Sequence, residues 1–107
     1  MSADNTDSLD LVFMALADKT RREMVHRLAN NQELTVTELT QDLTMSLAAA
    51  SKHIKVLEKA KLIRRRIEGR THYISLTPEQ FGIALDWISI YRNFWQSRMS
   101  ELANTLK

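Results

Sequence analysis

The chain has 107 residues, a length typical of one domain, and 44% of them are hydrophobic, an ordinary share for a globular protein. It contains no cysteine, which excludes disulfides, thiolate metal sites and thiol redox switches. The polar, acidic start MSADNTDSLD and the lack of any apolar run of about 18–20 residues argue against a secretion signal and a membrane span. We therefore expect a cytoplasmic protein with no membrane partner.

The first predicted helix follows a polar start. Residues 1–6 are expected to form a flexible tail, and apolar residues at helical spacing predict a helix over residues 8–17. Asp7 or Ser8 is expected to cap this helix, since short polar side chains accept hydrogen bonds from the first free N–H groups. Its apolar residues are Leu9, Val12, Phe13 and Leu16.

Short polar signals predict where the next two helices begin. Asp18 is a good N-cap for a helix from Lys19 to about Asn30. Thr35 and Glu38 match the T-x-x-E capping box, which opens a short helix ending at Leu43. The residues expected to be buried are Met24, Val25 and Leu28 in the longer helix and Val36, Leu39 and Leu43 in the shorter one.

A fourth helix follows the turn at residues 43–46, with Ser46 as its expected N-cap. The helical period divides the residues of this helix between two opposite sides. One side carries Leu47, Ala50, Ile54 and Leu57, and the opposite side carries Ala48, Lys52, Lys55 and Lys59. Two helices, a short turn between them, and a second helix that is apolar behind and basic in front predict a helix-turn-helix over residues 35–60.

A basic hairpin is predicted over residues 62–76, as two short strands around a turn at Glu68-Gly69-Arg70. Met45 to Leu76 holds eight of the fifteen Lys and Arg residues against two acids, whereas the rest of the chain holds seven bases and eleven acids. The net charge of +2 therefore conceals a basic face on a mildly acidic body. Such a face favours contact with a nucleic-acid backbone, and an ordinary solvated charged surface is the alternative.

The last helix is predicted over residues 78–106, with Thr77 as its cap, Pro78 in its first turn and Gln80 completing a capping box. It carries two apolar stripes, of which one is expected to pack on the body and the other to be left in water. The first comprises Phe81, Ala84, Ile88, Tyr91, Trp95, Met99, Leu102 and Leu106, and the second Ile83, Trp87, Ile90 and Phe94. An exposed stripe of this kind favours a homodimer, although both stripes wrapping around the body is an alternative.

Several segments in this order resemble the ArsR family of bacterial winged-helix transcriptional repressors. They are LVFMALADKTRREMVHRL, LTVTELTQDL, SKHIKVLEKAKLIRRRIEGRTHYISL and the tail containing Trp87, Tyr91 and Trp95. The fold class expected is mainly α with a small β-hairpin: a single winged helix-turn-helix domain over residues 1–107, with five helices and a two-stranded wing in the order α-α-α-α-β-β-α. The resemblance implies a homodimer built from the helices at 8–17 and 78–106, operator binding by the fourth helix and wing, and repression relieved by a signal.

The sequence departs from the metal-sensing members of that family. Those members carry a cysteine pair on the third helix, where this chain has Val36, Thr37, Glu38 and Leu39. Others place acid and histidine ligands on the last helix, which here has Asp86 and no histidine. The chain thus resembles the branch without metal-binding cysteines, and we expect no metal, no cofactor and an unknown effector.

The expected partner is double-stranded DNA, contacted by the fourth helix and wing. Phosphate contacts are assigned to Lys52, Lys55, Arg64, Arg66 and Arg70, with Thr71 beside them. Base reading is expected from Ser46, Ser51, Lys52 and His53, and close approach to thymine methyls from Ala48 and Ala49. An A·T-leaning operator follows from this set. For His53, half-buried packing is the alternative.

The dimer interface is expected to comprise Leu9, Val12, Phe13, Trp87, Ile88, Tyr91, Phe94, Trp95, Met99 and Leu102. No nucleophile and base, paired carboxylates or phosphate-cradling loop are evident, so the chain is not expected to be an enzyme. Two other functions stay open: a repressor that responds to a metal or small ligand at a site without cysteine, and a winged-helix module for protein–protein contacts.

Overall fold

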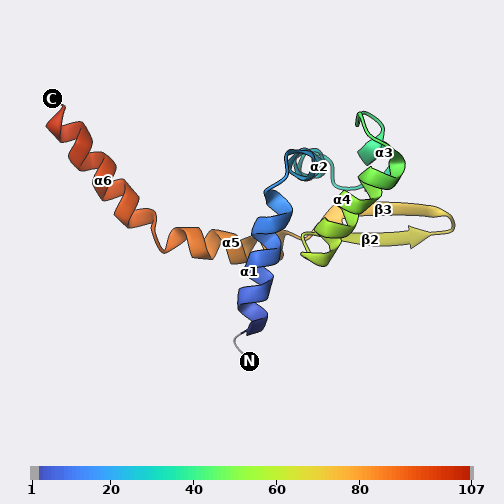
Figure 1. Cartoon of the computed structure of the whole chain (residues 1–107), viewed down its shortest axis with the longest axis horizontal. Helices are drawn as coiled ribbons and strands as arrows, with labels where there is room; N and C mark the ends of the chain where they lie inside the picture. The colour runs from blue at the N-terminus through green and yellow to red at the C-terminus, as the bar shows by residue number, and fades with distance from the viewer. Residues whose placement is uncertain (1–2, 107) are drawn as a thin grey trace.

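The computed structural model describes the backbone of residues 3–106 and the side chains of residues 8–106 (Figure 1). In this range the chain forms six helices and a small antiparallel sheet with strand order β1-β3-β2. The elements are α1 (Ala3–Leu16), α2 (Lys19–Ala29), β1 (Leu34–Thr35), α3 (Val36–Thr40), α4 (Leu47–Lys59), β2 (Ile63–Glu68), β3 (Thr71–Leu76), α5 (Pro78–Ser89) and α6 (Arg92–Thr105). The predicted fold class is confirmed, with a third strand and a sixth helix added.

Helix α1 begins earlier than expected. Because it starts at Ala3, the prediction of a flexible tail over residues 1–6 is wrong for 3–6, whereas Met1 and Ser2 lie outside the described residues. Asp7 and Ser8 lie inside the helix, so neither caps it. Helix formation is cooperative, and a helix anchored by buried Val12 extends through preceding residues that include no glycine or proline.

Three predicted caps are confirmed. The side chain of Asp18 accepts from the N–H of Arg21 at 3.1 Å, and that of Ser46 accepts from the N–H of Ala49 at 3.1 Å. Thr35 and Glu38 form the reciprocal capping box of α3. This helix ends at Thr40 and so stops short of the predicted Leu43.

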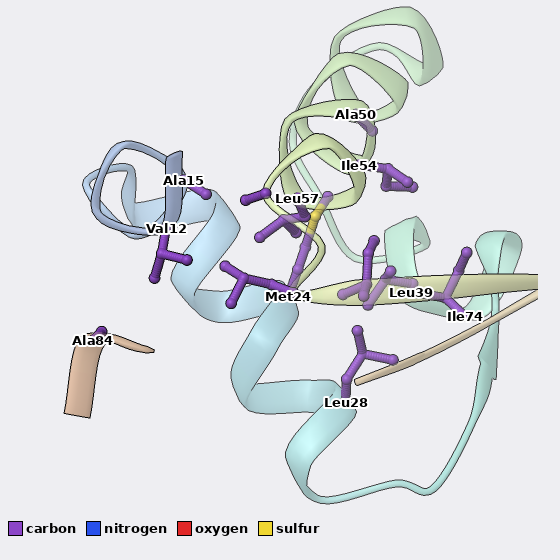
Figure 2. Close-up of a cluster of buried hydrophobic side chains, with 13 residues drawn as sticks. Val12, Ala15, Met24, Leu28, Leu39, Ala50, Ile54, Leu57, Ile74 and Ala84 are labelled. Carbon is purple, nitrogen blue, oxygen red and sulfur yellow. The ribbon is translucent and has the colours of Figure 1, made fainter. Parts of the chain in front are cut away.

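The core lies where α1, α2, α3, α4 and the sheet meet (Figure 2). Its buried residues are Val12, Ala15, Met24, Leu28, Leu39, Ala50, Ile54, Leu57, Ala60, Leu62, Ile63, Ile74 and Ala84. The predicted buried side of α4 is confirmed except for Leu47, which is 67% exposed. Leu47 precedes Ala50, the first core residue of α4, by almost one turn, so the helix there has passed the edge of the core.

The end of α4 turns the chain into the sheet. Lys61 has a φ of 61°, and the N–H groups of Lys61 and Leu62 donate to the carbonyls of Glu58 and Leu57 at 2.9 and 3.1 Å. These two bonds form a Schellman motif, a helix ending whose left-handed residue is most often glycine. The motif brings Leu62 and Ile63 into the core, and the hairpin starts directly afterwards.

Strands β2 and β3 form the predicted hairpin, with Ile63 opposite Leu76 and Glu68 opposite Thr71. Gly69 in its turn has a φ of +63°, a conformation that glycine adopts without the strain other residues suffer. Strand β1, which was not predicted, pairs antiparallel with β3. It has two residues, too few to show the alternation that identifies a strand.

The C-terminal helix is broken, contrary to prediction. Helix α5 ends at Ser89 and α6 begins at Arg92. The break contains no glycine or proline, but Ser89 and Ile90 are weaker helix formers than alanine or leucine. The predicted Thr77–Gln80 capping box is also wrong: Thr77 makes no side-chain cap, and Gln80 Nε2 donates to the carbonyl of Ala60 at 2.9 Å. This amide satisfies a carbonyl left free at the end of α4.

Helix α6 extends away from the body, on the side opposite the hairpin (Figure 1). Helix α5 packs on α1 through Ala84, but α6 has no buried residue. The prediction that one stripe packs on the body is therefore wrong from Leu85 onward, where both stripes are exposed. None of the described helices combines the length and apolarity that a bilayer crossing requires.

Candidate nucleic-acid interface

Helix α4 presents a basic outer face. Ala48, Lys52, Lys55 and Lys59 are exposed, while Ala50, Ile54 and Leu57 are buried on the opposite side. Ser46, which caps the helix, is exposed at the same end as Ala48. The small side chains of Ser46 and Ala48 leave the backbone of the first turn open to close approach by a ligand, and Lys52 and Lys55 follow on the same outer face.

His53 lies on the flank of α4 that faces α2 and is half-buried. Its Nδ1 lies 3.0 Å from Arg21 Nη1 and 3.8 Å from Asp18 Oδ2. Because a guanidinium only donates, Nδ1 is the acceptor and Nε2 carries the proton of the neutral ring. The structure thus places His53 with the α1–α2 junction, apart from Lys52 and Lys55.

Arg21 organises that junction, a role the sequence analysis did not assign to it. Its Nε donates to the carbonyl of Ala15 at 2.7 Å and its Nη2 to that of Met14 at 3.0 Å, satisfying the free end of α1. The backbone N–H of Arg21, which donates to the Asp18 carboxylate, holds the pKa of Asp18 below its ordinary value. One guanidinium therefore joins α1, α2 and α4.

On its other flank, α4 is tied to the hairpin. Arg65 binds Glu58 through two parallel contacts, Nε to Oε2 at 3.1 Å and Nη2 to Oε1 at 2.8 Å, and its Nη1 lies 2.8 Å from His72 Nδ1. The hydrogen bonds to Glu58 raise the pKa of Arg65. Arg65 is therefore paired with Glu58 and is not a freely solvated charge.

Arg64 and Arg66 lie on the opposite face of the hairpin from Arg65, as the two-residue period of a strand requires. Arg66 Nη2 lies 2.8 Å from Glu33 Oε1 and its Nη1 lies 2.6 Å from Glu68 Oε2. Its guanidinium also stacks 4.3 Å from the ring centroid of Tyr73. These hydrogen bonds raise the pKa of Arg66 and lower that of Glu33.

Arg64 has a weaker partner, Glu79 Oε1 at 3.6 Å. Three other predicted cations have none: among the described side chains, no carboxylate lies within 4.0 Å of Lys52, Lys55 or Arg70. Arg70 and Thr71 lie at the tip of the hairpin, beside Gly69. The predicted basic residues thus fall into a paired group on the outer sheet face and an unpaired group on α4 and the hairpin tip.

A groove of about 380 Å³ runs between α3, the first turns of α4 and the hairpin. Its lining combines hydroxyl groups, two guanidinium groups and apolar side chains: Thr35, Val36, Thr37, Leu47, Ser51, Arg65, Arg70, Thr71 and His72. The predicted residues Ser51, Arg70 and Thr71 meet there. The sequence analysis did not predict that Thr37 and Leu47 line this groove. For Leu47 the reason is that its helical spacing assigned it to the core.

The residues predicted for a dimer interface lie mainly along α1, α5 and α6. Val12 is an exception, because it is 0% exposed within the protomer and so belongs to the core. Phe13 makes an edge-to-face contact with Trp87 at 5.7 Å, and Trp87 in turn lies 5.2 Å from Tyr91. Leu9 is half-buried, and the remaining members, Ile88, Phe94, Trp95, Met99 and Leu102, are exposed.

Within the part of the chain that the structure describes, no cluster of three or more His, Asp or Glu side chains is arranged to hold a metal ion.

Comparison with known proteins agrees with this architecture. A family model described as a helix-turn-helix domain matches residues 16–66. The chain is 45% identical over 99 residues to the HTH-type transcriptional regulator Rv2034 of Mycobacterium tuberculosis, covering 92% of this chain and 89% of that protein.

Solved structures are similar as well. A crystal structure of an ArsR family transcriptional regulator, RHA00566, matches with a TM-score of 0.78 and 34% identity, covering 86% of this chain and 94% of that one. A homodimeric winged helix-turn-helix DNA-binding domain, Mb0332 of Mycobacterium bovis, matches with a TM-score of 0.67 at 24% identity, covering 87% of each chain. At that identity the second likeness supports the fold alone.

Proposed function

Since the chain belongs to the ArsR family of transcriptional regulators with a helix-turn-helix DNA-binding domain, we propose that it is a homodimeric repressor of its own or an adjacent promoter, acting without a metal. The observation that carries the proposal is the set of cations on α4 and the hairpin tip, Lys52, Lys55 and Arg70, for which the described side chains supply no carboxylate partner. Cations without carboxylate partners are free to replace counterions on DNA phosphates.

In this proposal α4 enters the major groove and the hairpin tip lies along the backbone. Lys52, Lys55 and Arg70 bind phosphates, and Thr71 supports the tip. The first turn of α4, with Ser46, Ala48, Ala49 and Ser51, faces the base edges, as the second helix of a helix-turn-helix does. His53, Arg64 and Arg66 contribute less than the sequence predicted, because each already has a partner in the protein.

The dimer is supported by the surface that one protomer leaves open. A 12.4 kDa chain exposes 7957 Å². A compact monomer of that mass exposes about 6,100 Å², so about 1,800 Å² is in excess. One partner of a stable complex buries roughly 800 Å² or more, and obligate dimers bury more than that. Pairing α1, α5 and α6 with a second copy covers the exposed aromatic residues there.

The wider domain assignment is part of the same proposal. The chain acts as one winged-helix domain, with its helix-turn-helix over residues 35–60, its wing over 62–76 and dimerisation helices at both ends. Metal independence is supported by the absence of cysteine, which removes one ligand set of metal-sensing members, and by the absence of histidine from residues 78–106, which removes the other.

The test is a mobility shift on the DNA upstream of the protein's own gene, at roughly 50 and 200 mM salt. We expect a retarded complex that weakens steeply at the higher salt, and a triple variant Lys52→Ala, Lys55→Ala, Arg70→Ala that binds far less. Lys19→Ala is the control, since Lys19 is an exposed cation outside residues 45–76. A complex insensitive to salt, or none, would favour a protein–protein module. Repression is read from a reporter gene behind the same promoter.

Metal dependence is tested in the same assay. Addition of zinc or a chelator is expected to leave the shift unchanged. Release of the DNA by either would instead favour a metal-responsive repressor.

A further inference from the structure

Two exposed large apolar side chains are not explained by a dimer. Among the described residues all the others lie on α1 or in the segment from Leu85 to Leu106, but Leu47, at 67% exposure, is the first residue of α4, and Ile67, at 61%, lies in the hairpin. Ile67 is outside the groove between α3, α4 and the hairpin, whereas Leu47 lines it. A single exposed apolar residue is ordinary on a protein surface, but Leu47 stands in the groove where the predicted DNA-contacting residues Ser51, Arg70 and Thr71 meet.

The surroundings of Leu47 are polar and cationic. The groove also contains the hydroxyls of Thr37, Ser51 and Thr71 and the guanidinium of Arg70, which suit phosphate, sugar and base-edge contacts. Ser51 is four residues after Leu47 and therefore lies on the same side of the helix. Val36, the other apolar residue of the lining, is half-buried, so Leu47 is the apolar side chain that this groove exposes within a site otherwise built for a nucleic acid.

The major groove offers one apolar feature to such a contact. Its base edges present hydrogen-bond donors and acceptors, except for the 5-methyl group of thymine. Leucine can neither donate nor accept, so it distinguishes bases only through that methyl. It also reaches further than Ala48 and Ala49, which follow it in the first turn.

We propose that Leu47 determines sequence specificity by packing against the 5-methyl group of a thymine in each half-site of the operator. This inference rests on the proposed function and deepens it. It names a base, where the unpaired cations provide only affinity for the backbone.

The experiment replaces thymine by deoxyuridine, which removes the methyl group and leaves base pairing intact. An operator is first selected from random DNA with the wild-type protein, and each thymine is then replaced in turn. At one position per half-site the wild-type protein should bind about fourfold more weakly, the effect of losing one buried carbon. With both half-sites replaced the loss should approach roughly fifteenfold, since separate positions act almost additively.

The Leu47→Ala variant should bind the thymine operator as weakly as the wild-type protein binds the operator with deoxyuridine in both half-sites. It should not distinguish thymine from deoxyuridine at that position. Because Leu47 is exposed, this variant is expected to keep the wild-type melting temperature. Ile67→Ala is the matched control, an exposed apolar residue outside the groove, and it should keep the discrimination.

The outcomes separate this proposal from the one on which it rests. Salt-dependent binding with no effect of deoxyuridine overturns the role of Leu47 and leaves the DNA-binding function intact. Full discrimination by Leu47→Ala also overturns it. Absence of any DNA complex with the wild-type protein overturns both.

Discussion

Three arginines of one hairpin stand in three different environments. Arg65 is clamped by Glu58 toward α4, Arg66 is held between Glu33 and Glu68 on the outer face, and Arg70 at the tip has no carboxylate within 4.0 Å among the described side chains. The guanidinium of Arg66 already binds two carboxylates, and it must release them before it can bind a phosphate. Equal formal charge therefore does not mean equal affinity for DNA.

This difference gives a prediction for the salt dependence of DNA binding. Arg70→Ala should lower the slope of log K against log [salt] by about one unit per protomer, about two for the dimer, and weaken binding to all duplexes alike. Arg66→Ala, which removes a paired charge, should leave the slope almost unchanged. Titrations of a labelled duplex at four salt concentrations measure both. Equal slopes for the two variants would mean that Arg66 leaves its carboxylates when DNA is bound.

A second prediction concerns Lys61, whose φ of 61° is unfavourable for a residue with a Cβ. Lys61→Gly should raise the free energy of unfolding by about 0.5–1 kcal/mol, because glycine adopts this conformation without strain. Lys59→Gly, at the last residue of α4 and in right-handed helical conformation, should lower the free energy of unfolding by a similar amount. Urea denaturation at one fixed protomer concentration provides the comparison, and a less stable Lys61→Gly protein would contradict the argument.

At the scale of elements, α4 and the hairpin behave as one unit because Glu58 and Arg65 connect them. The pair is only partly exposed and makes two parallel contacts, the geometry in which such a pair contributes most. It fixes how far Lys52 and Lys55 on the helix lie from Arg70 at the tip. We infer that it aligns the two parts of the DNA-binding surface without itself contacting DNA.

A double-mutant cycle tests this connection. Glu58→Gln, Arg65→Gln and the double variant should show a coupling free energy of about 1 kcal/mol in urea denaturation. Arg65→Gln should weaken DNA binding while the salt slope remains that of the wild type, since no phosphate contact is lost. Strictly additive changes in the free energy of unfolding would show that Glu58 and Arg65 are not coupled. A lower salt slope for Arg65→Gln would show that Arg65 binds phosphate directly.

At this scale the sequence predicted the local features well and the contacts between distant segments poorly. The caps at Asp18, Thr35 and Ser46 depend on residues three positions apart, so the local pattern identified them. Contacts between distant residues were not accessible in this way: Arg21 meets His53, and Glu33 meets Arg66, across more than thirty positions. Strand β1 exists only because β3 lies beside it.

Helical periodicity has a matching weakness at the ends of an element. It placed Ala50, Ile54 and Leu57 correctly in the core, but it placed Leu47 there as well, because a period says which side a residue is on and not where the core ends. The same limit applies to α6, whose stripes continue the pattern of α5 beyond any surface of the protomer that could cover them.

The whole molecule is extended for its length. Its radius of gyration is 17.6 Å and its extents are 60 × 39 × 23 Å. A compact chain of this length has a radius of gyration of about 13 Å. The difference reflects the hairpin and α6, which project from opposite sides of the body (Figure 1).

The exposure of α6 sharpens the prediction for Trp95. This side chain is 59% exposed in the protomer, so Trp95→Ala should leave the protomer folded and weaken the dimer. A loss of about 2 kcal/mol, roughly a thirtyfold increase in the dimer dissociation constant, is typical of a buried interface tryptophan. Sedimentation measures the association and circular dichroism the fold. Asn93→Ala, an exposed polar residue of the same helix, is the control, and an unchanged dimer would place Trp95 outside the interface.

Helix α6 has a consequence for the lifetime of the protein in a cell. A 14-residue helix with no buried residue is marginally stable in water, so in an unpaired protomer it opens readily and is accessible to proteases. Within the proposed dimer the same segment is covered. Turnover then falls mainly on single protomers, and one association equilibrium sets both how long the regulator survives and how fully it occupies its DNA.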